Sequence, residues 1–396
     1  MNEERLRICY VADLGSFLAR RWISYFARRG HSVTVFSPPI RSGQAPTFGP
    51  GTKPGRPSHP SVAEAELPDV RIHTLFRRPG MPKLIQLANV FSLHRILRAS
   101  RPHVLHAHYV RIYGWIAALT FFRPLVLTVW GGDILEDQGA FADLLGRKLT
   151  PFSLKRAALV TGHSTFLKQR VIQIGKPESQ VHLVGCPGVD RKLFRPGVRT
   201  DAIRRELGLQ GTRIVLCTRI MDTVYNTETI LRAIPFVLKE VPEARFVFSQ
   251  YLARPPYVEQ MKDLARELSI KDSLLFLEEI PFDRMPLFLN LAEILVSIPD
   301  SDSGMPQTVL EAMCCGTVPV VSDLPQYQDL IIPETNALVV CPKDPMAVAD
   351  AILKLLRDPV LRERLSEACV NTTMYCVDYE TEMQKMEKFY YELSGI

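Results

Sequence analysis

The sequence SIPDSDSGMPQTVLEAMCCGTVPVVSD, residues 297–323, combines a turn, a short helix and a strand in that order. Residues 301–304 are turn formers, and Pro306 suits the first turn of a helix because its missing N–H costs nothing there. Residues 308–321 continue as a helix, a glycine cap and a β-branched run that is typical of a buried parallel strand. A loop that leads into a helix N-terminus presents free N–H groups and the positive end of the helix dipole, so this segment suits a phosphate group.

Glu311 is a carboxylate among the apolar side chains of this predicted helix, where an unpaired charge would be expensive. A ligand with hydroxyl groups, such as a ribose, would give the carboxylate hydrogen-bond partners. The alternative is an acid that faces solvent and interacts favourably with the helix dipole. Taken alone, these residues leave both interpretations open.

The same stretch resembles the nucleotide-sugar motif of the family 4 retaining glycosyltransferases. That motif has two Glu separated by seven residues, then Ala-Met, a Gly and a Pro-Val-Val strand. Glu311 matches the second Glu, which in the family holds the ribose hydroxyls of the donor. The first Glu, which contacts the donor sugar, falls on Ser303, with Asp302 beside it. The resemblance implies a set of donor-binding residues around this helix: Asp302, Ser303, Gly304, Met305, Thr308 and Glu311.

Length and composition predict a globular protein of two domains. A chain of 396 residues exceeds one comfortable core, and its 46% hydrophobic content is ordinary. No segment reaches the roughly 18 uninterrupted apolar residues of a membrane helix, and the first residues lack the pattern of a signal peptide. The eight Cys are scattered without metal-ligand spacing, which favours reduced thiols. We therefore expect a cytoplasmic protein.

Charge is divided unevenly along the chain. Residues 1–198 hold 28 Lys+Arg against 12 Asp+Glu, a balance of +16, whereas residues 199–396 hold 20 against 30, a balance of −10. A basic half indicates an anionic partner, such as a phosphorylated acceptor, a lipid headgroup or the inner face of a membrane. The alternative is a set of solvated arginines on exposed helices. We expect no nucleic-acid partner.

The first residues predict the opening of a doubly wound sheet. Residues 7–12 and 31–36 have the pattern of strands, and a helix lies between them. Gly15, just after the first strand, would let a ligand approach the backbone. Asp13 would either meet a hydroxyl of the acceptor in a catalytic role or cap the helix that follows.

Two segments of this half have open interpretations. The helix at about residues 17–29 carries arginines beside Trp22, Tyr25 and Phe26. Such a helix can lie on a membrane, although packing against the core is the favoured interpretation. Residues 38–68 are rich in Pro, Gly and Ser and have no apolar period, which predicts a long mobile loop. The loop would serve either as a lid over the acceptor or as an insertion without a role.

A predicted strand at residues 102–108 ends in His106-Ala107-His108. We reject a His-x-His metal pair, because the period of a strand explains the spacing and no cluster of further ligands follows. In the resembling family a His at this strand end faces the cleft. The resemblance therefore implies a catalytic role for His108.

The next predicted strand ends at Trp130-Gly131-Gly132-Asp133. Many relatives place a His that touches the transferred sugar at the position of Trp130. This chain resembles a smaller group that carries Val-Trp-Gly-x-Asp. That resemblance implies that Trp130 and Gly131 contact the acceptor side and that Asp133 is a catalytic carboxylate. The alternative is a turn Asp beside a packed Trp.

In the second half, Arg219 follows a predicted strand. In the resembling family an Arg here and a Lys five residues later hold the donor diphosphate. Arg219 matches, whereas the Lys position is Val224, and Asn226 would donate a hydrogen bond instead. The family places the nucleotide base at the loop that contains Glu278 and Ile280, so these residues join the predicted donor site.

These observations predict an α/β protein of the GT-B architecture, with two Rossmann-like, doubly wound domains that face a cleft. Residues 1–195 would form the acceptor-side domain, residues 196–375 the nucleotide-sugar-binding domain, and residues 376–396 a helix that returns to the first domain. The resemblance implies a retaining glycosyltransferase of the hexosyltransferase type. Its co-substrate would be a UDP or GDP sugar, its acceptor lipid-linked or anionic, and it would need no metal or other cofactor.

Two other functions remain open at this point. One is a nucleotide-sugar epimerase of the same fold, which would consume the donor without an acceptor. The other is a non-catalytic protein that binds nucleotide sugars, because Ser303, Trp130 and Val224 depart from the family pattern.

Overall fold

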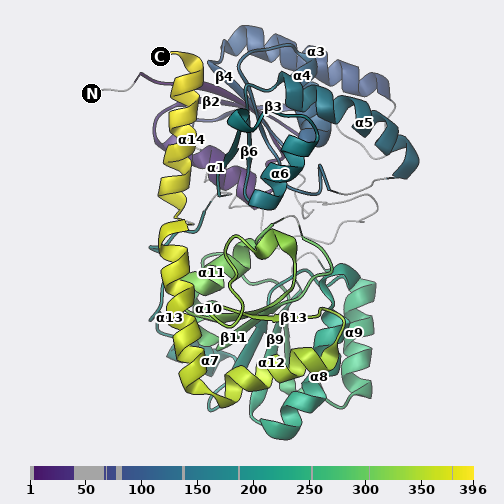
Figure 1. Cartoon of the computed structure of the whole chain (residues 1–396), viewed down its shortest axis with the longest axis vertical. Coiled ribbons are helices and arrows are strands. Elements are labelled where there is room, and N and C mark those ends of the chain that lie inside the picture. The colour runs from purple at the N-terminus through teal and green to yellow at the C-terminus, as the bar shows by residue number, and fades with distance from the viewer. Residues whose placement is uncertain are drawn as a thin grey trace. The chain divides into compact units, whose positions relative to one another are not determined.

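The computed structural model in Figure 1 describes residues 4–39, 67, 69–76, 83–135, 139–185, 188–250, 253–302, 304–376 and 378–396. The chain forms two compact units. Unit 1 comprises Met1–Pro187 and Glu380–Ile396, and unit 2 comprises Gly188–Tyr379. The first boundary therefore follows residue 187 rather than residue 195, and the returning segment starts at residue 380 rather than 376. Nearly all of the predicted loop at 38–68 lies outside the described residues.

Unit 1 is built on seven parallel strands in the order β3-β2-β1-β4-β5-β6-β7. The strands are β1 (Arg7–Val11), β2 (Ser32–Ser37), β3 (Arg71–Thr74), β4 (Val104–His108), β5 (Leu125–Thr128), β6 (Leu159–Gly162) and β7 (Val181–Leu183). The order reverses its direction between β1 and β4. In sheets of this kind ligands bind beyond the carboxyl ends of the strands at such a point.

Helices cover both faces of this sheet (Figure 1). One face carries α3 (Lys83–Ser100), α4 (Trp115–Leu119), α5 (Gly139–Arg156) and α6 (Thr165–Gln173). The other face carries α1 (Phe17–Arg28) and α14 (Tyr379–Ser394). Since side chains alternate along a strand, Leu105 and Ala107 of β4 face the first layer, and His106 and His108 face the second.

Helix α1 packs into the core, because Trp22, Tyr25 and Phe26 are buried. The favoured interpretation of this helix is confirmed, and its aromatic side chains are not available to a membrane. Helix α5 contains Pro151 in its interior.

Helix α14 is joined to unit 1 by buried polar contacts. The hydroxyl of Tyr390 lies 3.1 Å from that of Tyr10 and 2.5 Å from Nδ1 of His106. One oxygen of Glu387 accepts a hydrogen bond from Nε of Arg29 at 2.8 Å and lies 2.7 Å from Nε2 of His31. The end of the chain is thus part of the first folding unit.

Unit 2 is built on six parallel strands in the order β10-β9-β8-β11-β12-β13. The strands are β8 (Arg213–Cys217), β9 (Ala244–Ser249), β10 (Leu274–Leu277), β11 (Ile294–Ser297), β12 (Val318–Ser322) and β13 (Leu338–Val340). The helices are α7 (Asp201–Glu206), α8 (Thr227–Glu240), α9 (Pro255–Glu267), α10 (Met285–Leu291), α11 (Gln307–Cys315), α12 (Pro345–Arg357) and α13 (Pro359–Cys376). One core cluster packs α8, α9 and α12 against the sheet, and a second packs α10 and α11. The prediction of two Rossmann-like domains is confirmed.

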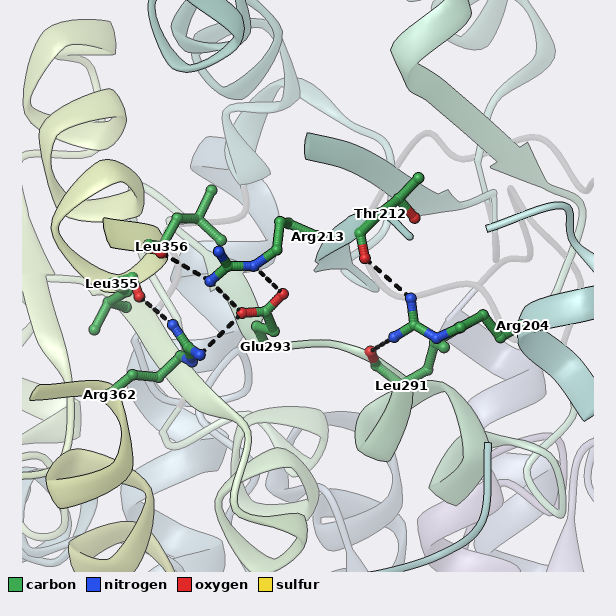
Figure 2. A network of polar contacts seen from close by, with 8 residues as sticks. All are labelled: Arg204, Thr212, Arg213, Leu291, Glu293, Leu355, Leu356 and Arg362. Carbon is green, nitrogen blue, oxygen red and sulfur yellow. Dashed lines mark hydrogen bonds and ion pairs between the residues drawn. The ribbon is translucent and has the colours of Figure 1, made fainter. Parts of the chain in front are cut away.

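Figure 2 shows a polar network at the edge of this sheet where β8 and β11 begin. Arg213 donates two hydrogen bonds of 2.6 Å to the carboxylate of Glu293, and Nη2 of Arg362 lies 3.2 Å from the same carboxylate. The two arginines also donate to the carbonyls of Leu356 and Leu355 at the end of α12. The network fixes the turn between α12 and α13 to the edge opposite the one that carries the predicted donor site.

Candidate functional site

Helix α11 starts at Gln307 and follows a loop that leaves the end of β11. Its N-cap residue, Pro306, makes no side-chain cap, so the side chain of the N-cap does not satisfy the N–H groups of the first turn. Those groups and the dipole of the helix favour an anion at this end. Gly316 closes the helix in the left-handed conformation with φ 79°, as a glycine C-cap should.

Glu311 lies in the middle of α11 and is only 3% exposed. The flanking residues Leu310 and Ala312 are buried as well. The alternative of a solvent-facing acid is therefore wrong. A buried carboxylate requires polar partners, and the predicted hydrogen bonds between Glu311 and a ribose stay a prediction.

Asp302 pairs with Arg219 across the carboxyl edge of the sheet. Nη2 of Arg219 lies 2.7 Å from Oδ2 of Asp302, and both side chains are largely buried. The same oxygen accepts a hydrogen bond of 3.0 Å from the hydroxyl of Tyr327. The guanidinium of Arg219 also lies over the ring of Tyr225, 4.5 Å from its centroid. The carboxylate of Asp302 therefore holds Arg219 and Tyr327, and its predicted role in donor binding stays a prediction.

Asn226 is predicted to bind the sugar donor, and like that of Asp302 its side chain bonds to other residues of this chain. Its amide nitrogen donates to the carbonyl of Ile298 at 2.9 Å and to Oδ1 of Asp300 at 2.8 Å. Its two amide hydrogens are therefore occupied by the loop that leads to α11. The predicted hydrogen bond from Asn226 to the diphosphate is corrected on this ground. The residue adopts φ 52°, a left-handed conformation that Asn tolerates better than most residues.

The other predicted donor residues lie at the same edge. Gly304 is buried, Met305 is half-buried against the core, and Thr308 lies in the first turn of α11. In the loop after β10, Glu278 is exposed and Ile280 is buried in the core. Ser303 lies outside the described residues. Unit 2 thus brings Arg219, Asp302 and the start of α11 together, while Ile280 serves packing.

In unit 1, Asp133 is fully buried and bonded to the backbone of two loops. One oxygen accepts from the N–H of Val110 at 2.7 Å, and the other accepts from Trp130 and Gly131 at 3.0 and 2.9 Å. Burial raises the pKa of Asp133 to about 6, although these backbone donors act to lower it. The sequence left two roles open for Asp133, a residue of the turn or a catalytic carboxylate. This geometry favours the structural role in the turn.

The loop that Asp133 holds contains unusual backbone. Tyr109 and Ile112, which follow β4, have φ of 78° and 66°. For a β-branched residue such as Ile112 this conformation is a strained one. The N–H of Val110 between them donates to Asp133, which shows how the strain is held in place.

His108 ends β4 in an aromatic surrounding. It is 3% exposed, and its ring lies 5.1 Å from that of Trp22 and 5.7 Å from that of Trp130. Within the described residues, both ring nitrogens of His108 and Nε1 of Trp130 have no hydrogen-bond partner. Burial lowers the pKa of His108 to about 3, so the ring is neutral. Unpartnered buried polar groups of this kind can accept a ligand or a water molecule.

Asp13 and Gly15 form a tight turn after β1. Oδ1 of Asp13 accepts from the N–H of Gly15 at 2.8 Å, and Oδ2 lies 3.4 Å from the hydroxyl of Tyr113. The cap of α1 is Ser16, whose hydroxyl accepts from Ala19. Asp13 is therefore not the helix cap, and its half-exposed side chain remains a candidate for contact with an acceptor.

Sequence reasoning missed Tyr225 and Tyr327. Both contact the Arg219–Asp302 pair, and Gln326 donates to the carbonyl of Asp302 at 2.9 Å. The only signal in the sequence is their position after β8 and β12, because strand ends of one edge converge. Among the described residues there is no group of three or more ligands that could hold a metal ion. No described helix has both the length and the apolar character needed to cross a bilayer.

We predict that Asp133→Ala destabilises unit 1 by at least about 3 kcal/mol. Two buried N–H groups and one partly buried N–H group lose their acceptor, and each unsatisfied group costs roughly 1–3 kcal/mol. Asp13→Ala, which frees one partly exposed N–H group, is the matched control and should cost less. Urea unfolding followed by tryptophan fluorescence measures this, since all three Trp lie in unit 1. If Asp133→Ala is as stable as the control but loses transfer activity, Asp133 is catalytic after all.

We also predict a pH-dependent effect of His108→Phe. The unfolded chain binds a proton on His108 below about pH 6.5, whereas the folded chain does so only near pH 3. Protonation of His108 in the unfolded chain therefore costs little stability above pH 6.5. As the pH falls below 6.5, the free energy of unfolding decreases. The free energy of unfolding of the variant, minus that of the wild type, should therefore be about 2 kcal/mol larger at pH 5 than at pH 7.5. A difference that does not change with pH would contradict a neutral His108.

Known proteins resemble both units. Residues 199–371 match the family model of glycosyl transferases group 1, and residues 18–187 match that of the glycosyl transferase 4-like domain. The D-inositol 3-phosphate glycosyltransferase of Xylanimonas cellulosilytica is 26% identical over 282 residues, which cover 66% of each chain. The enzyme of the same description from Acidothermus cellulolyticus is 29% identical over 54% of this chain and 49% of its own. The chain thus aligns with between about half and two thirds of these relatives.

Solved structures support the fold. The Anabaena protein HepE, crystallised with UDP, superposes with a TM-score of 0.78 at 16% identity, covering 98% of this chain and all of that one. At this identity the likeness shows the GT-B fold and not a shared substrate.

Proposed function

We propose that the chain, whose two units each match a family model of glycosyl transferases, transfers a hexose from a nucleoside diphosphate sugar to an acceptor with retention of configuration. The observation that carries the proposal is the buried carboxylate of Glu311 on a helix whose N-terminus has no side-chain cap. That helix begins at the same sheet edge as Arg219.

The donor would bind at the carboxyl edge of unit 2. Glu311 would accept hydrogen bonds from the ribose hydroxyls, and the first turn of α11 would donate to the diphosphate. Arg219 would contribute through Nε, which is buried and has no partner among the described residues, while its Nη2 stays on Asp302. A structural relative crystallised with UDP supports a nucleotide of this class, and UDP and GDP are the two candidates.

The reaction would break the bond between the anomeric carbon and the diphosphate oxygen. The acceptor oxygen would form its bond on the same face of the sugar, and its proton would pass to the leaving diphosphate. This route needs no side-chain nucleophile, whereas a double displacement would need one beside the anomeric carbon. The charge that develops on the diphosphate would be stabilised by the N-terminus of α11 and by Arg219, so we propose that no metal ion is needed.

The acceptor would contact unit 1. The side chains there that suit a hydroxyl are Asp13, beside Gly15, and His108, beside Trp130. Asp133 would act only by holding the loops that carry Trp130 and Gly131. Two of the relatives are described as D-inositol 3-phosphate glycosyltransferases, and the basic charge of this half supports an anionic or lipid-linked acceptor.

We predict that Glu311→Ala weakens the binding of UDP or GDP by about 1.5–3 kcal/mol, the range for hydrogen bonds to a charged group. Glu363→Ala, at an exposed position on α13 of the same unit, is the matched control and should bind like the wild type. Titration calorimetry of both variants with both nucleotides measures this. Equal affinities of the two variants for the nucleotide would show that Glu311 does not bind the ribose.

The same protein should release nucleotide from a donor sugar only when an acceptor is present. Release that needs no acceptor, with the sugar isomerised, would instead identify an epimerase. Binding of nucleotide without any turnover across a panel of acceptors would identify a binding protein.

A further inference from the structure

The outer side of α3 in unit 1 combines aromatic and basic side chains. Phe91 is 66% exposed, and Arg95 and Arg98 are exposed as well. Their spacing of four and then three residues places all three on one stripe of the helix. The inner side carries Leu93 and Leu97, which are buried in the core. Neither arginine forms an ion pair with another described residue.

Helix α5 repeats this arrangement. Lys148, Phe152 and Lys155 have the same spacing, and both lysines are exposed. The ring of Phe152 lies 6.3 Å from that of Phe121, which is 63% exposed in the turn before β5. The guanidinium of Arg156 lies over the ring of Phe121 at 4.9 Å from its centroid. The outer surface of α5 is thus also basic and aromatic.

The two stripes belong to one side of unit 1, because α4 lies between α3 and α5 and contacts both (Figure 1). The sequence contains no Asp or Glu in residues 83–132 or in residues 144–177, which include α3, α4 and most of α5. The stripes therefore have no acidic neighbour along these stretches of chain. This distribution accounts for a large part of the +16 balance of residues 1–198.

Exposed phenylalanines among exposed cations suit a partner that is anionic at its surface and apolar beneath it. A bilayer with acidic headgroups has this construction, since Lys and Arg contact the headgroups while aromatic rings enter the apolar boundary. A nucleic acid also carries negative charge, but only the faces of its bases could contact the phenylalanine rings. The exposed aromatic rings on this surface therefore favour a lipid bilayer as the partner.

We propose that this surface, called the basic-aromatic face and comprising Phe91, Arg95, Arg98, Phe121, Lys148 and Lys155, binds the surface of a bilayer that contains anionic lipid. The membrane contact expected from the charge of this half then belongs to α3 and α5. Helix α1, whose aromatic side chains are buried, does not provide it. The proposal does not depend on transfer activity, because it concerns the resting protein alone.

The test is sedimentation of the full chain with vesicles of phosphatidylcholine, alone or mixed with phosphatidylglycerol. The wild type should bind the anionic vesicles, and added salt should release it. Arg95→Glu with Arg98→Glu should weaken this binding about 30-fold or more, since each basic residue near such a surface contributes about a fivefold factor. The control, Lys239→Glu with Lys271→Glu, makes the same change of net charge at exposed positions of unit 2 and should bind like the wild type.

A second pair, Phe91→Ser with Phe121→Ser, keeps every charge and should also weaken vesicle binding. Melting temperatures followed by tryptophan fluorescence show that the variants of unit 1 are folded. Equal binding to neutral and anionic vesicles, or equal loss in the control pair, would overturn the proposal. So would a DNA duplex that displaces the protein from vesicles and binds more tightly than they do, because the face would then recognise nucleic acid.

Discussion

The first turn of α11 imposes the constraint on which the candidate site depends. Its N–H groups point toward the carboxyl edge of the second sheet, and the residue before them, Pro306, has no side-chain acceptor to offer. Helix ends that lack caps bind water or anions. Glu311 sits one turn further along the same helix in a buried position, so charge of both signs is concentrated within one short segment. A diphosphate joined to a ribose carries the complementary groups in the corresponding order.

The surrounding loops are fixed by contacts within the chain. Asp302 pairs with Arg219 and Tyr327, and Asn226 holds the carbonyl of Ile298. These contacts join the segments after β8, β11 and β12 into one rigid edge. The ion pair also means that Arg219 brings less free positive charge to a diphosphate than an unpaired arginine would. The N-terminus of α11 would therefore provide more of the stabilisation of the diphosphate charge.

The architecture and the motif could be predicted from sequence because they depend on local patterns. The β-branched run after Gly316 and the amphipathic α1 each contain enough information in a few residues. The partners of Asp302 and Asp133 could not be predicted in this way. Asp302 is 83 residues from Arg219, and Asp133 bonds to the N–H of Val110 in a loop of unusual backbone. Each side chain stood beside a plausible ligand position in the sequence, but the fold uses it to join strand ends.

The central claim is that α11 and Glu311 hold a nucleoside diphosphate. A crystal structure of the chain soaked with UDP and, separately, with GDP tests this claim most directly. The account predicts the diphosphate against the first turn of α11, within reach of Nε of Arg219, and the ribose hydroxyls on the carboxylate of Glu311. A nucleotide bound elsewhere, or a ribose that leaves Glu311 untouched at full occupancy, would contradict it.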